Sequence, residues 1–246
     1  SRGIKKGSLI NMLKAFVSPR IAAAVVLAAG GVASASSVDI GFTRITNNGN
    51  GVNPASQFVC TIADVIGQSN QVTFTFKNNV GIASNIAEIY FDDRNPLQLL
   101  SLNATLVQIG CSFTGGGASP GNLPGGATLS PAFNAIQSFS ADVNPGPPSN
   151  GLNVAGDSLT MQFTLQPGRD YNSVVSAISQ GTLRLGLHVR SIGTVGGSDS
   201  FVDGGQIQVV PLPMGAWAGL GGLLMAAGIR NGCGRRAGEH VPRAWP

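Results

Sequence analysis

The stretch Leu159-Thr160-Met161-Gln162-Phe163-Thr164-Leu165-Gln166 alternates apolar and polar side chains without interruption. Successive side chains of an extended chain point to opposite sides, so this period of two predicts a β-strand with one buried and one solvent-facing side. The same alternation occurs at 72–77 (VTFTFK) and at 183–190 (LRLGLHVR). Together these segments predict a sheet that covers a hydrophobic core.

Weaker strand patterns surround these three segments. They occur at 58–65, 86–91 and 105–113, and the stretches between them are rich in Gly, Asn and Pro. Many short strands joined by turns are typical of all-β domains with two packed layers. We therefore predict an all-β fold, a β-sandwich with a jelly-roll or Greek-key path.

One short helix is expected within this fold. Asp170 is a residue type that caps helix N-termini, and Val174, Val175 and Ile178 would then fall on one side of the helix. Gly181 stands where a glycine commonly follows the last turn. The sequence thus predicts a helix between Asp170 and Gly181.

Charge divides the chain into three parts. Residues 1–35 carry five cations and no acid, and residues 210–246 carry four Arg and one Glu. Residues 36–209 form a mildly acidic region with six cations and ten acids, long enough for one domain with its own core. The net charge of +4 therefore belongs to the ends, and we expect no nucleic-acid partner for the domain.

The N-terminal part has the pattern of a secretory signal peptide. Residues 1–11 precede Met12 and are expected to be an upstream extension. The apolar stretch 21–32 follows two cations, and the small residues Ala33 and Ala35 flank Ser34. This order predicts export and cleavage between Ala35 and Ser36.

The C-terminal part combines three signals. The motif Val210-Pro211-Leu212-Pro213 precedes an uncharged apolar run at 214–229. A basic cluster, Arg230, Arg235 and Arg236, follows this run and favours a cytoplasmic end. We predict a single hydrophobic helix that holds the exported precursor in the membrane.

This three-part end resembles the PEP-CTERM family of sorting signals in its Val-Pro-Leu-Pro variant. Segments 79–93, 117–126 and 185–201 also look like exported proteins that bear the signal. The resemblance implies an exosortase-type membrane peptidase as partner, processing near the proline motif, and a final location at the cell surface or outside the cell. Exopolysaccharide is a further partner to consider, and the resemblance implies no catalytic activity.

Two cysteines lie in the expected domain. Cys60 and Cys111 both fall in strand-like segments, and outside the cytoplasm they could form a disulfide that closes a long loop. Two buried free thiols would give the same sequence pattern. Both alternatives stay open at the level of sequence.

Four carboxylates are candidates for a calcium site, since calcium accepts oxygen ligands in irregular loops. Asp92 and Asp93 follow a predicted strand, and Asp199 and Asp203 lie in a Gly-rich stretch. Turn residues whose side chains bond to the backbone would look the same. The favoured expectation is no metal and no cofactor. His188 is interpreted as a solvated strand residue.

These patterns favour a structural or interaction protein over an enzyme. The sequence lacks a phosphate-binding loop. A carbohydrate-binding module or adhesin is the alternative, but sugar platforms usually stack on exposed aromatic rings. Between residues 36 and 209 the chain has no Trp and two Tyr, Tyr90 and Tyr171. A secreted hydrolase is the weakest of the three hypotheses.

Overall fold

The computed structural model describes residues 35–48, 51–79, 81–93, 99–116, 121–135, 139–146 and 149–209. Its elements are β1 (Ser37–Arg44), β2 (Phe58–Val65), β3 (Gln68–Asn78), β4 (Asn85–Asp93), β5 (Leu100–Ile109), β6 (Phe113–Gly115), β7 (Ser140–Val143), β8 (Ser158–Leu165), α1 (Tyr171–Ser179), β9 (Leu183–Ile192) and β10 (Gly197–Val209). Two 3-10 turns lie at Ala55–Gln57 and Gly126–Thr128. The prediction of an all-β fold with one short helix is confirmed. None of the helices in the described ranges has the length and apolar character needed to span a membrane.

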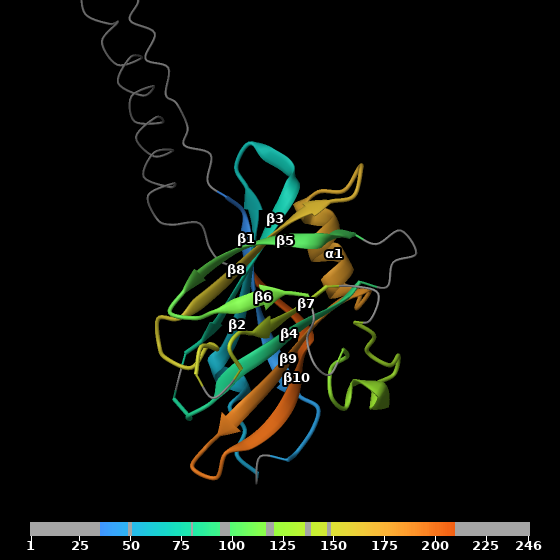
Figure 1. Ribbon diagram of the computed structural model, residues 1–246. Coiled ribbons are helices and arrows are strands. Elements are labelled where there is room, and N and C mark those ends of the chain that lie inside the picture. The colour runs from blue at the N-terminus through green and yellow to red at the C-terminus, as the bar shows by residue number, and fades with distance from the viewer. Residues whose placement is uncertain are drawn as a thin grey trace, which may run out of the picture. The chain divides into compact units, whose positions relative to one another are not determined.

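All ten strands belong to one antiparallel sheet, in the order β5-β8-β3-β2-β1-β10-β9-β4-β7-β6. Early strands pair with late ones, β1 with β10, β4 with β9 and β5 with β8, as in a jelly-roll path (Figure 1). The first and last strands of this order, β5 and β6, are consecutive in the chain. The sheet therefore curves back on itself around one interior.

The core lies between the two halves of this curved sheet. Phe74 of β3 meets Phe91 of β4 with ring centroids 5.2 Å apart, and Phe163 of β8 meets Phe91 at 5.0 Å. Both pairs pack edge to face, an arrangement that adds to the stabilisation from burial. The two layers of the expected sandwich are thus two halves of one sheet.

The three alternating segments form β3, β8 and β9, and their apolar side chains are buried as predicted. The weaker patterns at 58–65 and 86–91 correspond to β2 and β4. The pattern at 105–113 divides into β5 and β6 because Gly110 adopts φ +69°, a left-handed conformation that breaks the strand. Gly110 also lies so close to Asp157 that a β-carbon there would overlap its carboxylate.

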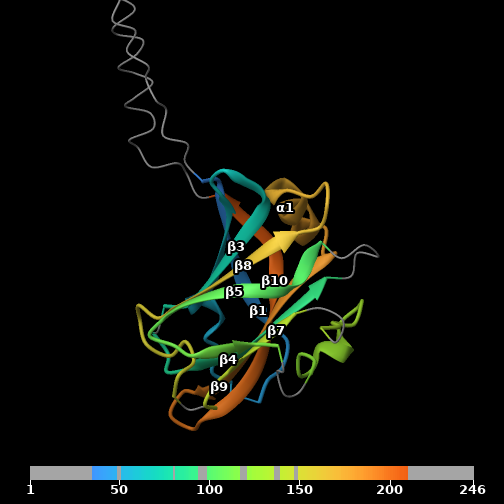
Figure 2. The ribbon, with the colours of Figure 1, turned by 45° about the horizontal axis from the view of Figure 1, so that its top comes forward.

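Helix α1 lies at one end of the strands (Figures 1 and 2). Asp170 Oδ1 accepts a hydrogen bond from the Ser173 amide at 2.8 Å, which confirms the predicted cap. Gly181 N–H donates to Ile178, and Thr182 N–H donates to the Ala177 carbonyl, each at 2.9 Å. This pair of bonds is the Schellman termination that a glycine after the last turn favours.

Candidate functional site

The outer side of β4 and β9 is covered by the chain itself. We call the outward residues of these two strands the covered face: Glu88, Tyr90, Asp92, Arg184, Gly186, His188 and Arg190. Segment 121–135, yellow-green in Figure 1, lies beside these strands. Its residues Leu123, Phe133 and Ala135 are buried in a small second core together with Tyr90. Most side chains of the covered face are therefore withdrawn from solvent.

Gly186 makes room for this segment. A β-carbon at Gly186 would lie 2.9 Å from Leu123 Cδ2 and 3.0 Å from Phe133 Cζ, closer than ordinary contact distance. Among the alternating polar positions of β9, Gly186 alone has no side chain, and the segment packs in the space that results. The sequence placed Gly186 on the outer side without revealing why a glycine stands there.

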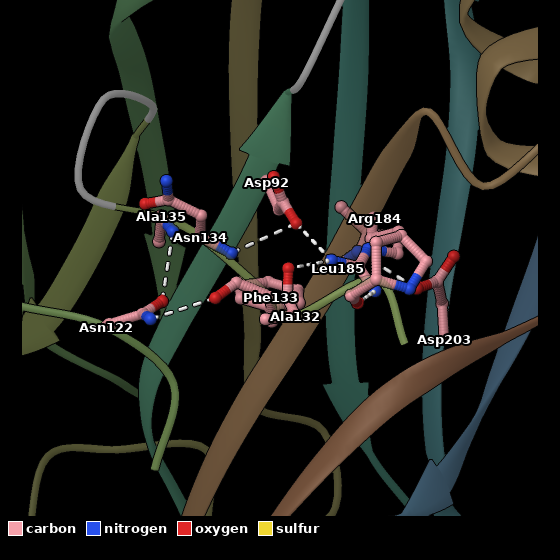
Figure 3. Close-up of polar contacts among 10 residues, drawn as sticks. Asp92, Asn122, Ala132, Phe133, Asn134, Ala135, Arg184, Leu185 and Asp203 are labelled. Carbon is pink, nitrogen blue, oxygen red and sulfur yellow. Dashed lines mark hydrogen bonds and ion pairs between the residues drawn. The ribbon is translucent and has the colours of Figure 1, made fainter. Parts of the chain in front are cut away.

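Arg184 anchors the segment to the sheet (Figure 3). Its Nη1 donates to the Pro131 carbonyl at 2.8 Å, and its Nη2 donates to the Ala132 carbonyl at 2.9 Å. Nη2 also forms an ion pair with the buried carboxylate of Asp92. The guanidinium carbon lies 5.2 Å from the centre of the Phe133 ring, within reach of a cation–π interaction. One side chain thus joins β4, β9 and the covering segment.

Two further groups fix the same segment. Asp92 Oδ2 accepts the Asn134 amide at 3.1 Å. Asn122 spans the segment, because its Nδ2 donates to the Phe133 carbonyl at 2.9 Å and its Oδ1 accepts the Ala135 amide at 3.0 Å (Figure 3). These bonds satisfy backbone groups that burial removes from water. Together these contacts hold segment 121–135 against β4 and β9.

A second cluster of ionisable side chains lies further along β9 and includes one residue of β4. His188 Nδ1 lies 2.6 Å from Glu88 Oε2, and Arg190 Nη2 donates to Glu88 Oε1 at 2.6 Å. Glu88 is 1% exposed and His188 9% exposed. The interpretation of His188 as a solvated residue is wrong. Its partner, Glu88, lies directly opposite on β4, a register that the sequence of β9 alone does not reveal.

The four carboxylates considered for calcium have separate partners. Asp92 and Asp93 are adjacent in β4, and Asp93 Oδ2 accepts the amides of Leu99 and Leu100 at 2.5 and 2.8 Å, where β5 begins. Successive side chains of a strand point to opposite sides, and the two groups bond to different segments. In the parts of the chain that the structure describes, no group of three or more His, Cys, Asp or Glu side chains could hold a metal ion.

Asp199 and Asp203 of β10 bond to different elements. Asp199 Oδ1 accepts the Thr46 hydroxyl at 2.9 Å and the Asn48 amide at 2.6 Å, and so fixes the chain after β1. Asp203 Oδ1 accepts the Leu185 amide at 3.1 Å. Burial of Asp203, which is 9% exposed, raises the pKa of its carboxyl to about 7. Both act within the domain as hydrogen-bond acceptors.

The two cysteines are free thiols, so the structure contains no bridge between Cys60 and Cys111. Cys60 points into the core from β2, and burial raises the pKa of its thiol well above the ordinary value. Cys111 lies between β5 and β6, where its Sγ donates to the Ser158 carbonyl at 3.3 Å. Burial raises the pKa of Cys111 to about 11, so both thiols are protonated at neutral pH.

The other half of the sheet has an uncovered outer side. We call the outward residues of β2, β3, β8 and β5 the open face: Val59, Thr61, Ala63, Gln71, Thr73, Thr75, Lys77, Thr105, Val107, Ile109, Thr160, Gln162 and Thr164. They are half-buried or exposed, and Lys77 is the one charged residue among them. Thr61, Thr75 and Thr160 form a row across three strands, with Thr75 and Thr160 hydroxyl oxygens 2.9 Å apart. Hydroxyl and amide groups both donate and accept, so this face can hydrogen-bond an uncharged polar partner.

The sorting residues mostly lie outside the described residues. These are Ala33, Val210, Pro211, Leu212, Pro213, Arg230, Arg235 and Arg236. Ala35 and Ser36 are described, and they directly precede β1. No family model, curated protein or solved structure matches this chain.

Proposed function

We propose that this chain is an exported, non-catalytic interaction protein of the cell surface or extracellular matrix. It reaches that location as a membrane-held precursor, which an exosortase-type peptidase processes near Pro211 and Pro213. The sequence signals at both ends support this pathway. Several charged groups of the domain hold loops to the sheet, among them Asp92, Arg184 and Asp199, and this use supports a binding role over a catalytic one.

The observation that carries the proposal is the pairing of the first and last strands. Val38 of β1 lies opposite Val209 of β10, so the chain enters and leaves the domain on neighbouring strands. The proline motif begins at the next residue, Val210, without a spacer. Proline lacks the amide N–H that a ladder needs, so the motif cannot prolong β10 as a regular strand. A domain of this form suits attachment to the membrane through the segment that follows β10.

The direct test follows the C-terminus during export. An epitope tag after Pro246 should be absent from the surface form in cells with the sorting peptidase and should persist in cells without it. Neutral replacement of Arg230, Arg235 and Arg236 should mislocalise the precursor, because the basic stop is lost. A tag that remains on the surface-exposed form in both strains would overturn the sorting proposal.

A carbohydrate-binding module or adhesin is the second candidate, and the open face favours it. Its uncharged hydroxyl and amide groups suit a neutral polysaccharide, which offers hydroxyl donors and acceptors of the same kind. Lys77 is the single charged side chain of this face, so the attraction to phosphate or to acidic sugars is weak. Because the face has no aromatic ring for stacking, we expect weak binding that gains strength from many contacts along a polymer.

Affinity electrophoresis tests this second candidate. The purified protein should be retarded in gels that contain a neutral polysaccharide and should migrate unchanged in gels that contain an acidic one. Equal mobility in all gels would remove the carbohydrate-binding candidate and leave the sorting proposal unaffected.

A further inference from the structure

An open cavity of about 550 Å³ lies where the chain enters the domain. Ser36 contributes to its wall just before β1, and the turn between β2 and β3 contributes a second side. Asp170 and Tyr171, at the start of α1, form a third. The cavity thus lies between the beginning of the domain and α1, the only α-helix among the described residues.

Asp64 of β2 lies in this cavity beside Ser36. The Asp64 amide donates to the Ser36 carbonyl at 3.1 Å, so the two residues face each other across neighbouring strands. Oδ1 of Asp64 is buried and has no hydrogen-bond partner among the described residues. A buried carboxylate oxygen without a donor is costly, by about 1–3 kcal/mol or more for a charged group. A further group with a hydrogen-bond donor could therefore bind at Asp64 Oδ1.

The other ionisable groups of the cavity do not supply one. Asp170 accepts from the Ser173 amide and hydroxyl, and these bonds lower the pKa of its carboxyl. Burial and then the negative charge of Asp64 raise the pKa of the Tyr171 hydroxyl. The titratable groups that face the cavity are therefore Asp64, Asp170 and Tyr171, and its lining contains no Lys, Arg or His.

We propose that this cavity is the binding site for the α-ammonium group of Ser36, which pairs with the Asp64 carboxylate after the leader is removed. The inference rests on the proposed export, with cleavage between Ala35 and Ser36. Hydrolysis of that peptide bond by water leaves a carboxylate on Ala35 and an amine on Ser36, which takes up a proton. Before cleavage the same nitrogen is an uncharged amide with a single N–H. Removal of the leader therefore creates a cation on a residue that lines the same cavity as the unpaired Asp64 oxygen.

The pair makes the stability of the domain depend on cleavage and on pH. A neighbouring carboxylate raises the pKa of an amine above its unfolded value of about 7.7–8.0. The stabilisation is complete below that value and disappears as pH rises through the higher folded pKa. The positive end of the α1 dipole opposes the ammonium, and the Asp170 carboxylate offsets this effect.

The test compares two purified chains in detergent, one beginning at Ser36 and one at Gly31, both ending at Pro246. The five extra residues can displace the ammonium by about 15 Å. At pH 6.5 the chain that begins at Ser36 should melt about 2–4 °C higher. The difference should vanish at a pH above the amine pKa, and it should vanish in Asp64→Asn chains at either pH.

Asp170→Asn serves as the control variant, since it changes the other carboxylate of the cavity. It should lower both melting temperatures and leave a smaller but measurable difference between them, because Asp170 only offsets the helix dipole whereas Asp64 pairs with the ammonium. Equal melting of the two starting chains, or a difference that persists in Asp64→Asn, would overturn the inference. The N-terminal residue of the exported protein, measured by mass spectrometry, tests the proposed cleavage separately. A different N-terminus would reject the cleavage site even if the purified chains show the ion pair.

Discussion

The two halves of the curved sheet use polar residues in opposite ways. On the covered face, the half-buried Arg184 and the buried Asp92 bind a loop of the same chain. On the open face, Thr75 and Thr160 bond to each other and remain accessible from outside. Charge is concentrated where solvent is excluded, and the open face carries a single charged side chain, Lys77.

This difference shows that a charged cluster is weak evidence for a reactive site in this molecule. A buried ion pair must be matched with hydrogen bonds, because the loss of hydration is costly. The carbonyls of Pro131 and Ala132 provide such partners for Arg184, and the segment they belong to is fixed as a result. The hydroxyl and amide groups of the open face hold no loop of the described chain in this way. They are therefore available to bind a partner.

Removal of Arg184 should have the largest effect. Arg184→Met leaves the buried Asp92 carboxylate without its cation and frees the segment at 131–132. We expect a loss of about 3–5 kcal/mol in the free energy of unfolding, measured with denaturant. Lys77→Met removes an exposed cation from β3 in the other half and should change stability by less than about 0.5 kcal/mol. Similar losses in the two variants would contradict the contrast between the halves.

Asp203 should give the covered half a distinct pH dependence. Its folded pKa of about 7 lies above the unfolded value, so the folded state holds the proton more tightly. Stability should therefore fall as pH rises from about 4 through 7 and then level off. Asp203→Asn should be more stable than the natural protein at pH 8, by about 2–4 kcal/mol, with the gain vanishing below pH 4. Denaturant unfolding across this range gives the measurement, and a constant difference between the two proteins would exclude Asp203 as the cause.

Gly186→Ala tests the close packing of the covering segment. The added methyl would press on Leu123 and Phe133, and overpacking of this kind costs about 1–3 kcal/mol. Gly41→Ala in β1 is the matched control, because its β-carbon would meet no atom within 4 Å. Thermal unfolding should show a lower midpoint for Gly186→Ala alone. Equal destabilisation of Gly41→Ala would show that the loss of stability does not come from contact with Leu123 and Phe133.

The open face should tolerate substitution with the smallest effect on stability. Thr75→Val combined with Thr160→Val removes both hydroxyl partners and keeps the side-chain shape, so the free energy of unfolding should change by less than about 1 kcal/mol. Retardation in polysaccharide gels should nevertheless weaken. Unchanged retardation would show that these hydroxyls are not part of the binding surface.

The fold was predictable from sequence where local pattern and tertiary environment agree. Alternation identified β3, β8 and β9, and the residue types of Asp170 and Gly181 identified both ends of α1. Each of these signals depends on residues close in the chain. The inward side of each strand followed from the same alternation, since a period of two separates the faces.

The covered face was not predictable in the same way. Asp92 and Arg184 are 92 residues apart in sequence and opposite each other in the sheet. Burial of the outer side depends on segment 121–135, which lies in a Gly-, Asn- and Pro-rich stretch without strand alternation. Gly186, among charged neighbours in β9, was the one local sign that something packs on that side.

The most direct test of the central claim compares retention in the surface matrix after the introduction of charge. Thr105→Glu with Thr164→Glu places two carboxylates on exposed positions of the open face, and Ile66→Glu with Val195→Glu places two on exposed turns elsewhere. With unfolding midpoints matched, the measured quantity is the fraction of exported protein that stays with washed cells. The first variant should be released several-fold more than the second, because buried charge without a partner weakens the contact. Equal retention of both variants would contradict the assignment of the open face as the interaction surface.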